Sequence, residues 1–209
     1  MKMRKIKALL LVLSTLLILT SCAGIKDGSG KQADMDKIFN TVCSADEALA
    51  LAKSSGVVVI EERGCTSGKE IWNDFYKKAS EGKPASVLCA HYYILDKDYV
   101  SEELYEQEKD LYPQLFFYML KFDGKKYSID IRMSTSEKSD GQDIYDCLNH
   151  YTGDAPTSDA LFERYDYYVL TDDPNVTWDE ITRSMLDSST PEYIRHCTVY
   201  DDFEGWKGK

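Results

Sequence analysis

The stretch QLFFYMLKFDGKKYSIDIRM, residues 114–133, decides the fold. Two runs rich in aromatic and β-branched residues, Gln114 to Phe122 and Lys125 to Met133, flank the dipeptide Asp123-Gly124. An Asp-Gly dipeptide between two such runs is a strong short-range signal of a β-hairpin, because both residues tolerate the positive φ angles of a tight turn. The stretch therefore predicts two antiparallel strands, from which the rest of a sheet builds outward.

Outside this hairpin, five more segments read as strands. They are rich in the β-branched and aromatic residues that suit a pleated, partly buried surface. The turn-rich sequence Gly153-Asp154-Ala155-Pro156 joins the third and fourth of them. The expected strands are Val57–Ile60, Ala85–Leu95, Ile144–Tyr151, Leu161–Leu170 and Cys197–Tyr200.

Capping signals mark the helices. Three segments place a Ser or Thr three residues before a Glu, a pattern in which each side chain satisfies a free backbone amide of the first turn. Behind the second of them, an apolar stripe at helical spacing runs from Ile71 to Ala79, and Ser101 is placed to cap a short acidic helix that ends near Asp110. The three segments are Ser44–Glu47, Ser67–Glu70 and Thr177–Glu180.

Early helices followed by a run of hairpins predict an α+β fold. We expect a mostly antiparallel, twisted sheet with two or three helices packed on one face. The same arrangement predicts that Trp72, Phe75 and Leu88 are mostly buried, since they belong to the apolar sides of a helix and a strand that face each other.

The charge of the chain limits its partners. The chain has 209 residues and a formal net charge of −11. Residues 1–21 hold four of its 25 Lys and Arg and none of its 36 Asp and Glu, so their removal leaves 21 basic against 36 acidic residues, a net charge of −15. This balance argues against a nucleic-acid partner, which requires a basic face, and against a body that lies flat on an anionic membrane.

The N-terminus carries a basic start, an apolar run of 12 residues from Ala8 to Leu19, and then Leu19-Thr20-Ser21-Cys22. A membrane-spanning helix needs about 20 apolar residues, so a run of this length indicates the hydrophobic region of a signal peptide. The alternative is an uncleaved anchor or a buried helix.

This N-terminus resembles the signal peptide and lipobox of bacterial lipoproteins. The resemblance implies cleavage before Cys22, a diacylglycerol on the Cys22 thiol, and an extracytoplasmic domain held to the cell membrane by lipid. The expected organisation is a cleaved signal peptide at 1–21, a lipidated cysteine and flexible linker at 22–40, one globular α+β domain at 41–204, and a frayed tail at 205–209.

The body is also loosely similar to small uncharacterised lipoproteins of Gram-positive bacteria. The similarity rests on the strand entry GKPASV at 82–87, the hairpin sequence FDGK at 122–125, and the late segment LTDD-x-x-VTW at 170–178. It implies no known activity.

Cysteine and histidine supply the candidates for metal binding or catalysis. Cys89 and His91 would point to the same face of an extended strand, and thiolate and imidazole both suit zinc. The spacing is not diagnostic, so Cys89 and His91 are weak metal candidates, and a buried cysteine beside a half-buried histidine is the plainer interpretation. The same residue types could form a Cys–His nucleophile pair. We expect no cofactor.

Five cysteines follow Cys22, and an odd number leaves at least one thiol free or paired between chains. Their spacing leaves the pairing open, with at most one or two bridges expected. They are Cys43, Cys65, Cys89, Cys147 and Cys197.

One segment imitates a phosphate-binding loop. Gly64 and Gly68-Lys69 follow an expected strand and precede an expected helix. The loop requires four residues between its glycines and a hydroxyl after the lysine, whereas this chain has three residues there and Glu70 after the lysine. We therefore expect a strand-to-helix turn and no nucleotide site.

The favoured hypothesis is a membrane-tethered, non-enzymatic domain that binds a protein or an envelope component. The alternative is a small extracytoplasmic hydrolase or zinc-binding protein that uses Cys/His residues or an acidic cleft.

Overall fold

The computed structural model describes residues 28–155, 157–158, 160–186 and 193–207. The chain divides into two compact units, residues 1–33 and 34–209, and the second unit holds both β-sheets. Its helices in chain order are α2 (Gly28–Phe39, which begins in the first unit), α3 (Ala45–Ser55), α4 (Lys69–Ser80), α5 (Glu102–Glu108), the 3-10 turn η1 (Lys109–Leu111) and α6 (Trp178–Leu186).

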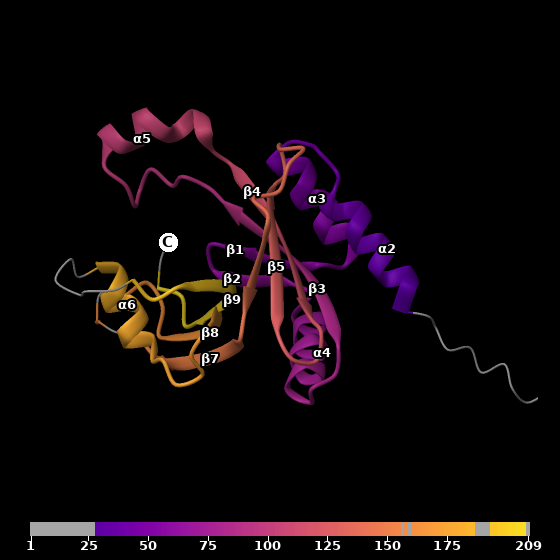
Figure 1. The fold of residues 1–209 in the computed structure, drawn as a ribbon. Helices are drawn as coiled ribbons and strands as arrows, with labels where there is room; N and C mark the ends of the chain where they lie inside the picture. Colours follow the sequence, from indigo (N-terminus) through magenta and orange to yellow (C-terminus); the bar gives the residue numbers. More distant parts are fainter. Residues whose placement is uncertain (1–27, 156, 159, 187–192, 208–209) are drawn as a thin grey trace, which may run out of the picture. The chain divides into compact units, whose positions relative to one another are not determined.

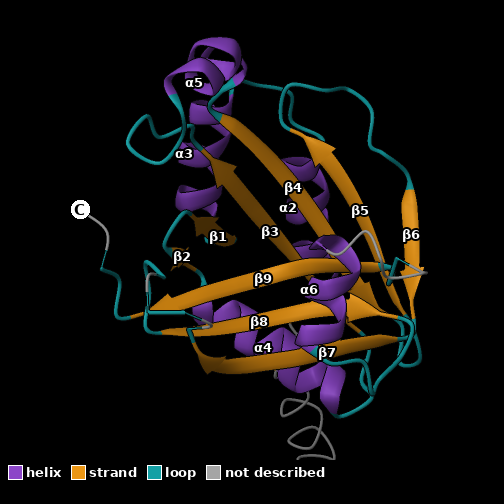
Figure 2. Cartoon of the chain, turned by 90° about the vertical axis from the view of Figure 1, so that its left-hand side faces the viewer, coloured by secondary structure: helices purple, strands orange, loops and turns teal. Residues whose placement is uncertain are grey.

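The larger sheet has six strands in the order β2-β1-β3-β4-β5-β6. All its neighbours pair antiparallel except β1 and β3, which are parallel and are connected through β2 and α4. Figure 1 labels β1 to β5 of this sheet, and Figure 2 shows β3, β4, β5 and β6 side by side. Their bounds are β1 Val58–Glu61, β2 Gly64–Ser67, β3 Ala85–Tyr93, β4 Gln114–Phe122, β5 Tyr127–Met133 and β6 Gln142–Tyr145.

The predicted hairpin supplies two neighbouring strands of this sheet, β4 and β5. β4 has the predicted bounds, and β5 pairs with it antiparallel from Phe116 opposite Met133 to Phe122 opposite Tyr127. The turn is longer than a two-residue connection because the Asp123 carboxylate accepts hydrogen bonds from the backbone amides of Lys125 and Lys126 at 2.7 and 2.9 Å. This extra turn makes β5 begin two residues later than predicted.

The smaller sheet has three antiparallel strands in the order β7-β8-β9, namely Cys147–Asp154, Arg164–Thr171 and His196–Glu204. Figure 2 shows them side by side, with α6 over them. The sequence predicted one strand from Ile144 to Tyr151, but the structure interrupts it at Asp146 and places its two parts, β6 and β7, in different sheets. The expected single sheet is therefore two sheets, while the α+β class and the mainly antiparallel pairing are confirmed.

Helices cover both faces of the larger sheet. On one face, Ala48 and Ala52 of α3 are buried against Leu88. On the other, Trp72 of α4 is buried with Cys89, the next residue of β3. The sequence-based expectation placed the helices on one face. Because the centres of β1 and β3 are buried on both sides, their sequences are continuous apolar runs without the alternation that marks a single covered face.

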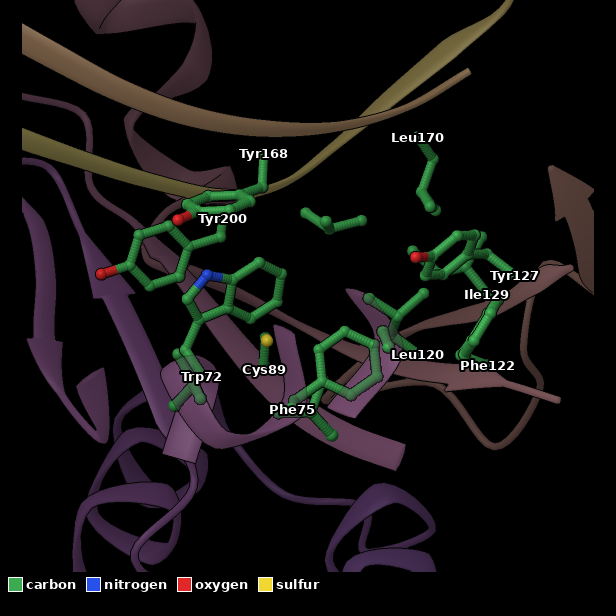
Figure 3. Close-up of a cluster of buried hydrophobic side chains, with 14 of the residues drawn as sticks. Trp72, Phe75, Cys89, Leu120, Phe122, Tyr127, Ile129, Tyr168, Leu170 and Tyr200 are labelled. Carbon is green, nitrogen blue, oxygen red and sulfur yellow. The ribbon is translucent and has the colours of Figure 1, made fainter. Parts of the chain in front are cut away.

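The core between the two sheets is built around Trp72, whose ring stacks on Tyr200 at 4.7 Å and meets Tyr168 edge-on at 5.1 Å (Figure 3). Both tyrosines belong to the smaller sheet, so that sheet has its inner face on a core shared with α4 and the larger sheet. Trp72, Phe75 and Leu88 are 0, 2 and 1 % exposed, which confirms their predicted burial.

Two of the three predicted capping boxes are confirmed. In the first, the Glu47 carboxylate accepts from the Ser44 amide and the Ser44 hydroxyl accepts from the Glu47 amide. Glu180 and Thr177 exchange the same two hydrogen bonds in the second. The hydroxyl of Ser101 also accepts from the Leu104 amide, as predicted for α5. The box at Ser67 is wrong: α4 begins after Gly68, and Ser67 is the last residue of β2.

The segments expected to be loose are partly ordered. Residues 28–39 of the expected linker form α2, whose last residues Ile38 and Phe39 are buried. In the expected frayed tail, the Lys207 amide donates to the Leu161 carbonyl at 2.6 Å and the Trp206 ring lies 5.4 Å from the Arg63 guanidinium. Residues 1–27, including Cys22, and residues 208–209 lie outside the described part of the chain. None of the helices described is long and apolar enough to cross a membrane.

Candidate functional site

Tyr92, the second-to-last residue of β3, is the centre of the candidate site. Its side chain points to the α3 face of the sheet, and its hydroxyl donates to the Asp46 carboxylate at 2.7 Å. Asp46 lies in the first turn of α3, where the Ser44–Glu47 capping box fixes the start of the helix. Burial and then the hydrogen bond to Asp46 raise the pKa of Tyr92 to about 12, so this phenol remains a hydrogen-bond donor at neutral pH.

The excursion between β3 and β4, residues 94–113, forms a wall of the site, and we call it the arm. It contains α5 and η1, neither of which has a buried residue. In Figures 1 and 2 it lies beyond the ends of β3 and β4, at the end of the sheet opposite α4. An element with so few buried contacts opens more readily than a core strand, as is usual for segments that close on a ligand.

A pocket of about 350 Å³ lies between the arm, the start of α3 and the end of β3. We call it the arm pocket. It has two lining residues from the end of β3 and just beyond it, Tyr92 and Ile94. The others are Asp46, Leu95, Tyr105, Lys109, Tyr112 and Pro113.

A second pocket of about 220 Å³, the hairpin pocket, shares Tyr92 and Ile94 with the first. Its other lining residues belong to the β1–β2 hairpin and are Glu61, Glu62, Arg63 and Thr66. Because the two pockets share two residues, they adjoin each other along the end of β3. Together they offer aromatic faces, carboxylates and two cations on a partly hollowed surface, the usual mixture of a ligand site.

The carboxylates of the hairpin pocket differ in environment. Glu61 is paired with Lys53 at 2.7 Å. The pKa of Glu62 is raised by burial and then by the negative charge of Asp96 in the arm. A cationic group placed near Glu62 and Asp96 would relieve this repulsion.

Cys89 and His91, the metal candidates from the sequence, lie on the same face of β3, as their spacing predicts. That face is opposite to Tyr92 and is turned into the core, so neither side chain reaches the pockets. Burial raises the pKa of the Cys89 thiol far above its usual range, whereas a nucleophilic cysteine needs a lowered pKa. Burial also lowers the pKa of His91 to about 4, and one ring nitrogen of His91 lies 3.3 Å from the Val199 carbonyl oxygen.

The two other histidines of the chain, His150 and His196, do not join them. His150 interacts with the Asp166 carboxylate at 2.5 Å, and a ring nitrogen of His196 lies 2.7 Å from the Ile194 carbonyl. Across the described ranges, no three His, Cys, Asp or Glu side chains gather closely enough to hold a metal ion. Each of the five cysteines after Cys22 is a free thiol in the structure.

The strand-to-helix turn expected at Gly64 to Gly68 is wrong, because a further strand occupies most of this segment. Gly64 to Ser67, the residues of the supposed loop, form β2 and pair antiparallel with β1. Their amides are therefore used in the sheet and in contacts with β9, where the Cys65 amide donates to the Asp202 carboxylate at 3.3 Å.

A titrating group outside the pockets lies on β9. Asp201 is half-buried, and burial followed by the charge of Asp202 raises its pKa to about 7. Its charge in turn contributes to the raised pKa values of Tyr93, Tyr118 and Tyr167, and also of Cys89, which lie on the elements around it.

We expect Asp201→Asn to stabilise the protein more at high pH than at low pH. A carboxyl group whose pKa is raised on folding contributes stability below its unfolded value of about 4, and that contribution is lost as pH rises through about 7. The free energy of unfolding of the variant should therefore exceed that of the wild type by an amount that grows between about pH 4 and pH 7. Above pH 7 the difference should reach about 1–2 kcal/mol, allowing for partial solvent exposure.

Urea unfolding at several pH values measures this difference. Burial lowers the pKa of His91, so its effect on the free energy of unfolding changes with pH in the opposite direction. This effect drops out of the difference between variant and wild type because both proteins contain His91. Asp140→Asn, at an exposed aspartate, is the matched control and should change stability by less than about 0.5 kcal/mol at every pH. A gain for Asp201→Asn that does not change with pH would contradict the prediction.

No motif in the sequence marks the residues of the two pockets as a site. The available signals were the Ser101 cap, which located the arm, and the apolar and aromatic residues that interrupt its acidic sequence, among them Tyr99, Leu104 and Leu111. Comparison of the chain with protein-family models, curated proteins and solved structures gave no match.

Proposed function

We propose that this chain is a lipid-anchored, extracytoplasmic binding domain that holds a protein or an envelope component in the two pockets around Tyr92. The observation that carries the proposal is the pair of adjoining pockets between the β1–β2 hairpin, α3 and the weakly packed arm. Tyrosine is well suited to such surfaces, because its ring supplies apolar contact and its hydroxyl a hydrogen bond with little loss of conformational entropy.

The proposed location rests on the lipobox. Diacylglycerol on Cys22 would hold the domain to the membrane, since two acyl chains give stable anchoring where one gives only marginal binding. The net charge of −15 after removal of residues 1–21 favours a domain that stands away from an anionic membrane surface.

Binding is favoured over the alternative of a hydrolase or zinc protein by the chemistry of the pockets. The described residues that line them include neither Cys nor His, the residue types on which the first form of that alternative was based. Its second form, an acidic cleft, needs available carboxylates, but Asp46 accepts from the Tyr92 hydroxyl and Glu61 is paired with Lys53. Tyr92 and Tyr105 instead present rings, and Asp46 and Glu62 present carboxylates, which suits recognition by contact and charge.

A photo-crosslinking experiment in native cells tests both parts of the proposal. Tyr105 in the arm pocket is replaced by benzoylphenylalanine, which preserves an aromatic ring, and Tyr193, an exposed tyrosine of the segment before β9, receives the same replacement as the control. We expect a crosslinked adduct from position 105 and none from position 193. We also expect Cys22→Ser to move the protein from the membrane to the soluble fraction.

Absence of an adduct at position 105, or equal adducts at both positions, would refute the pockets as the binding site. Retention of Cys22→Ser in the membrane fraction would refute the lipid anchor separately.

A further inference from the structure

The arm carries an unusual density of negative charge. Its 20 residues contain seven Asp and Glu and two Lys, an excess of five negative charges, whereas the whole chain after residue 21 has an excess of 15 over 188 residues. The arm's two lysines pair with two of its own carboxylates, Lys97 with Glu102 at 3.7 Å and Lys109 with Glu106 at 2.5 Å. The electrostatic potential around the arm and the arm pocket is therefore negative, which favours a cationic ligand.

The arm also exposes apolar surface. Leu111, Tyr99 and Leu104 are 62, 49 and 39 % exposed, and Tyr93 and Ile94 at its base are similarly open to solvent. Half of the exposed large apolar residues of the described chain lie in this one excursion and the residue before it. A concentration of apolar side chains within a charged segment is typical of a surface that binds another protein.

An ammonium group already rests on an arm tyrosine. Lys97 Nζ lies 5.5 Å from the centre of the Tyr105 ring, within the range of a cation–π interaction. Tyr105 lines the arm pocket together with Tyr112 and the Asp46 carboxylate. Lys109 also lines the pocket, and its charge is offset by Glu106 at 2.5 Å. The pocket thus combines aromatic faces and a carboxylate, the two features that bind the side chains of lysine and arginine.

We infer that the ligand of the arm and its pocket is a basic polypeptide segment, which places a Lys or Arg side chain against Tyr105 and Asp46 and apolar side chains against Leu104 and Leu111. The inference rests on the proposed binding function and specifies its ligand class. Charge complementarity between an acidic arm and a basic segment would speed association and exclude acidic partners, while the apolar contacts and the pocket would supply most of the affinity.

Selection from a display library of random peptides on the purified full-length chain tests the inference. Peptides of about 12 residues, which extend to about 40 Å, are long enough to span the arm. We expect the recovered peptides to be enriched in Lys and Arg and to contain Leu, Phe or Tyr. Fluorescence anisotropy then measures the affinity of a recovered peptide and of its counterpart with every Lys and Arg replaced by Glu, which should not bind.

Matched variants locate the binding. Glu103→Lys reverses a charge on α5, and Glu70→Lys makes the same change at an exposed position in the first turn of α4, outside the lining of both pockets. At low salt, Glu103→Lys should weaken the basic peptide about fivefold and Glu70→Lys less than about twofold. Tyr105→Ala should weaken it about tenfold by removing the ring from the pocket.

Recovery of neutral or acidic peptides, or of none, would overturn the inference, as would equal effects of Glu103→Lys and Glu70→Lys. A failed selection accompanied by a crosslink at position 105 in cells would show that the binding function holds and the ligand class is wrong. Failure of both experiments would refute the proposed function itself.

Discussion

Replacing Arg132 with methionine is expected to lower the free energy of unfolding by about 3–4 kcal/mol. Arg132 is a β5 residue with 2 % exposure whose guanidinium donates to backbone carbonyls from two separate segments. The carbonyl of Thr41 accepts at 2.7 Å and that of Met133 at 3.1 Å, and the carbonyls of Phe39 and Ser136 also accept from it. Methionine fills a similar volume but leaves these carbonyls without their donor.

Arg132→Lys should recover only part of this loss, because an ammonium keeps the charge but cannot reproduce the planar arrangement of donors. Arg195→Met is the matched control. Arg195 is a more exposed residue that pairs with Asp143 and Asp172, each at 3.0 Å. It also donates to the Ile144 carbonyl at 2.9 Å and lies over the Tyr145 ring, so its replacement should cost about 1–2 kcal/mol. Urea unfolding gives all three values, and equal costs at positions 132 and 195 would contradict the structural role of Arg132.

Gly64→Ala is expected to lower stability by about 3–5 kcal/mol. Gly64 begins β2 with a φ angle of +97°, and a Cβ atom built on it would lie 2.6 Å from the Asp202 Cα atom and 2.8 Å from the Phe203 backbone nitrogen. These are backbone atoms of β9, so no side-chain rotation can relieve the clash. The larger sheet and β9 would have to move apart where the Lys69 ammonium meets the Asp202 carboxylate at 2.5 Å.

Gly141→Ala separates the clash from the backbone strain. Gly141 has nearly the same φ angle, +100°, but nothing lies within 4 Å of the position of its Cβ atom. This variant should therefore show only the cost of a positive φ angle, about 1 kcal/mol. Thermal and urea unfolding of the two variants measures the difference, and an equally small loss at both positions would show that β2 and β9 do not need close contact.

The local features of the fold could be predicted from the sequence. The Asp123-Gly124 hairpin and the caps at Ser44, Ser101 and Thr177 depend on residues close together in the chain, whose physical preferences agree with the final structure. The helical spacing of apolar residues likewise predicted that Trp72 is buried, although it did not show that Tyr168 and Tyr200 cover it. The break at Asp146 was missed because β6 and β7 are both strands, and only their partners, β5 and β8, show that they belong to different sheets.

The candidate site could not be predicted in the same way. Tyr92, Asp46 and Tyr105 come from a strand, a helix and the arm, and nothing in their local sequence brings them together. Cys89 and His91 were metal candidates because of the chemistry of their side chains. The amino-acid pattern of β3 does not show that a second sheet covers their face of the strand. The acidic residues of the arm can be recognised in the sequence, but the sequence does not show that the arm lies beside a pocket.

If the chain is tethered through Cys22 as proposed, Arg132 lies where mechanical load would enter the domain. Its guanidinium joins the backbone at Phe39 and Thr41 to β5, a strand of the larger sheet that is paired on both sides, and to the loop after it. In a domain tethered through Cys22, tension between the membrane and a bound partner would pass through this junction. The load would be shared by several hydrogen bonds of one buried side chain, so the tether would pull on the sheet rather than unwind α3 from its exposed end.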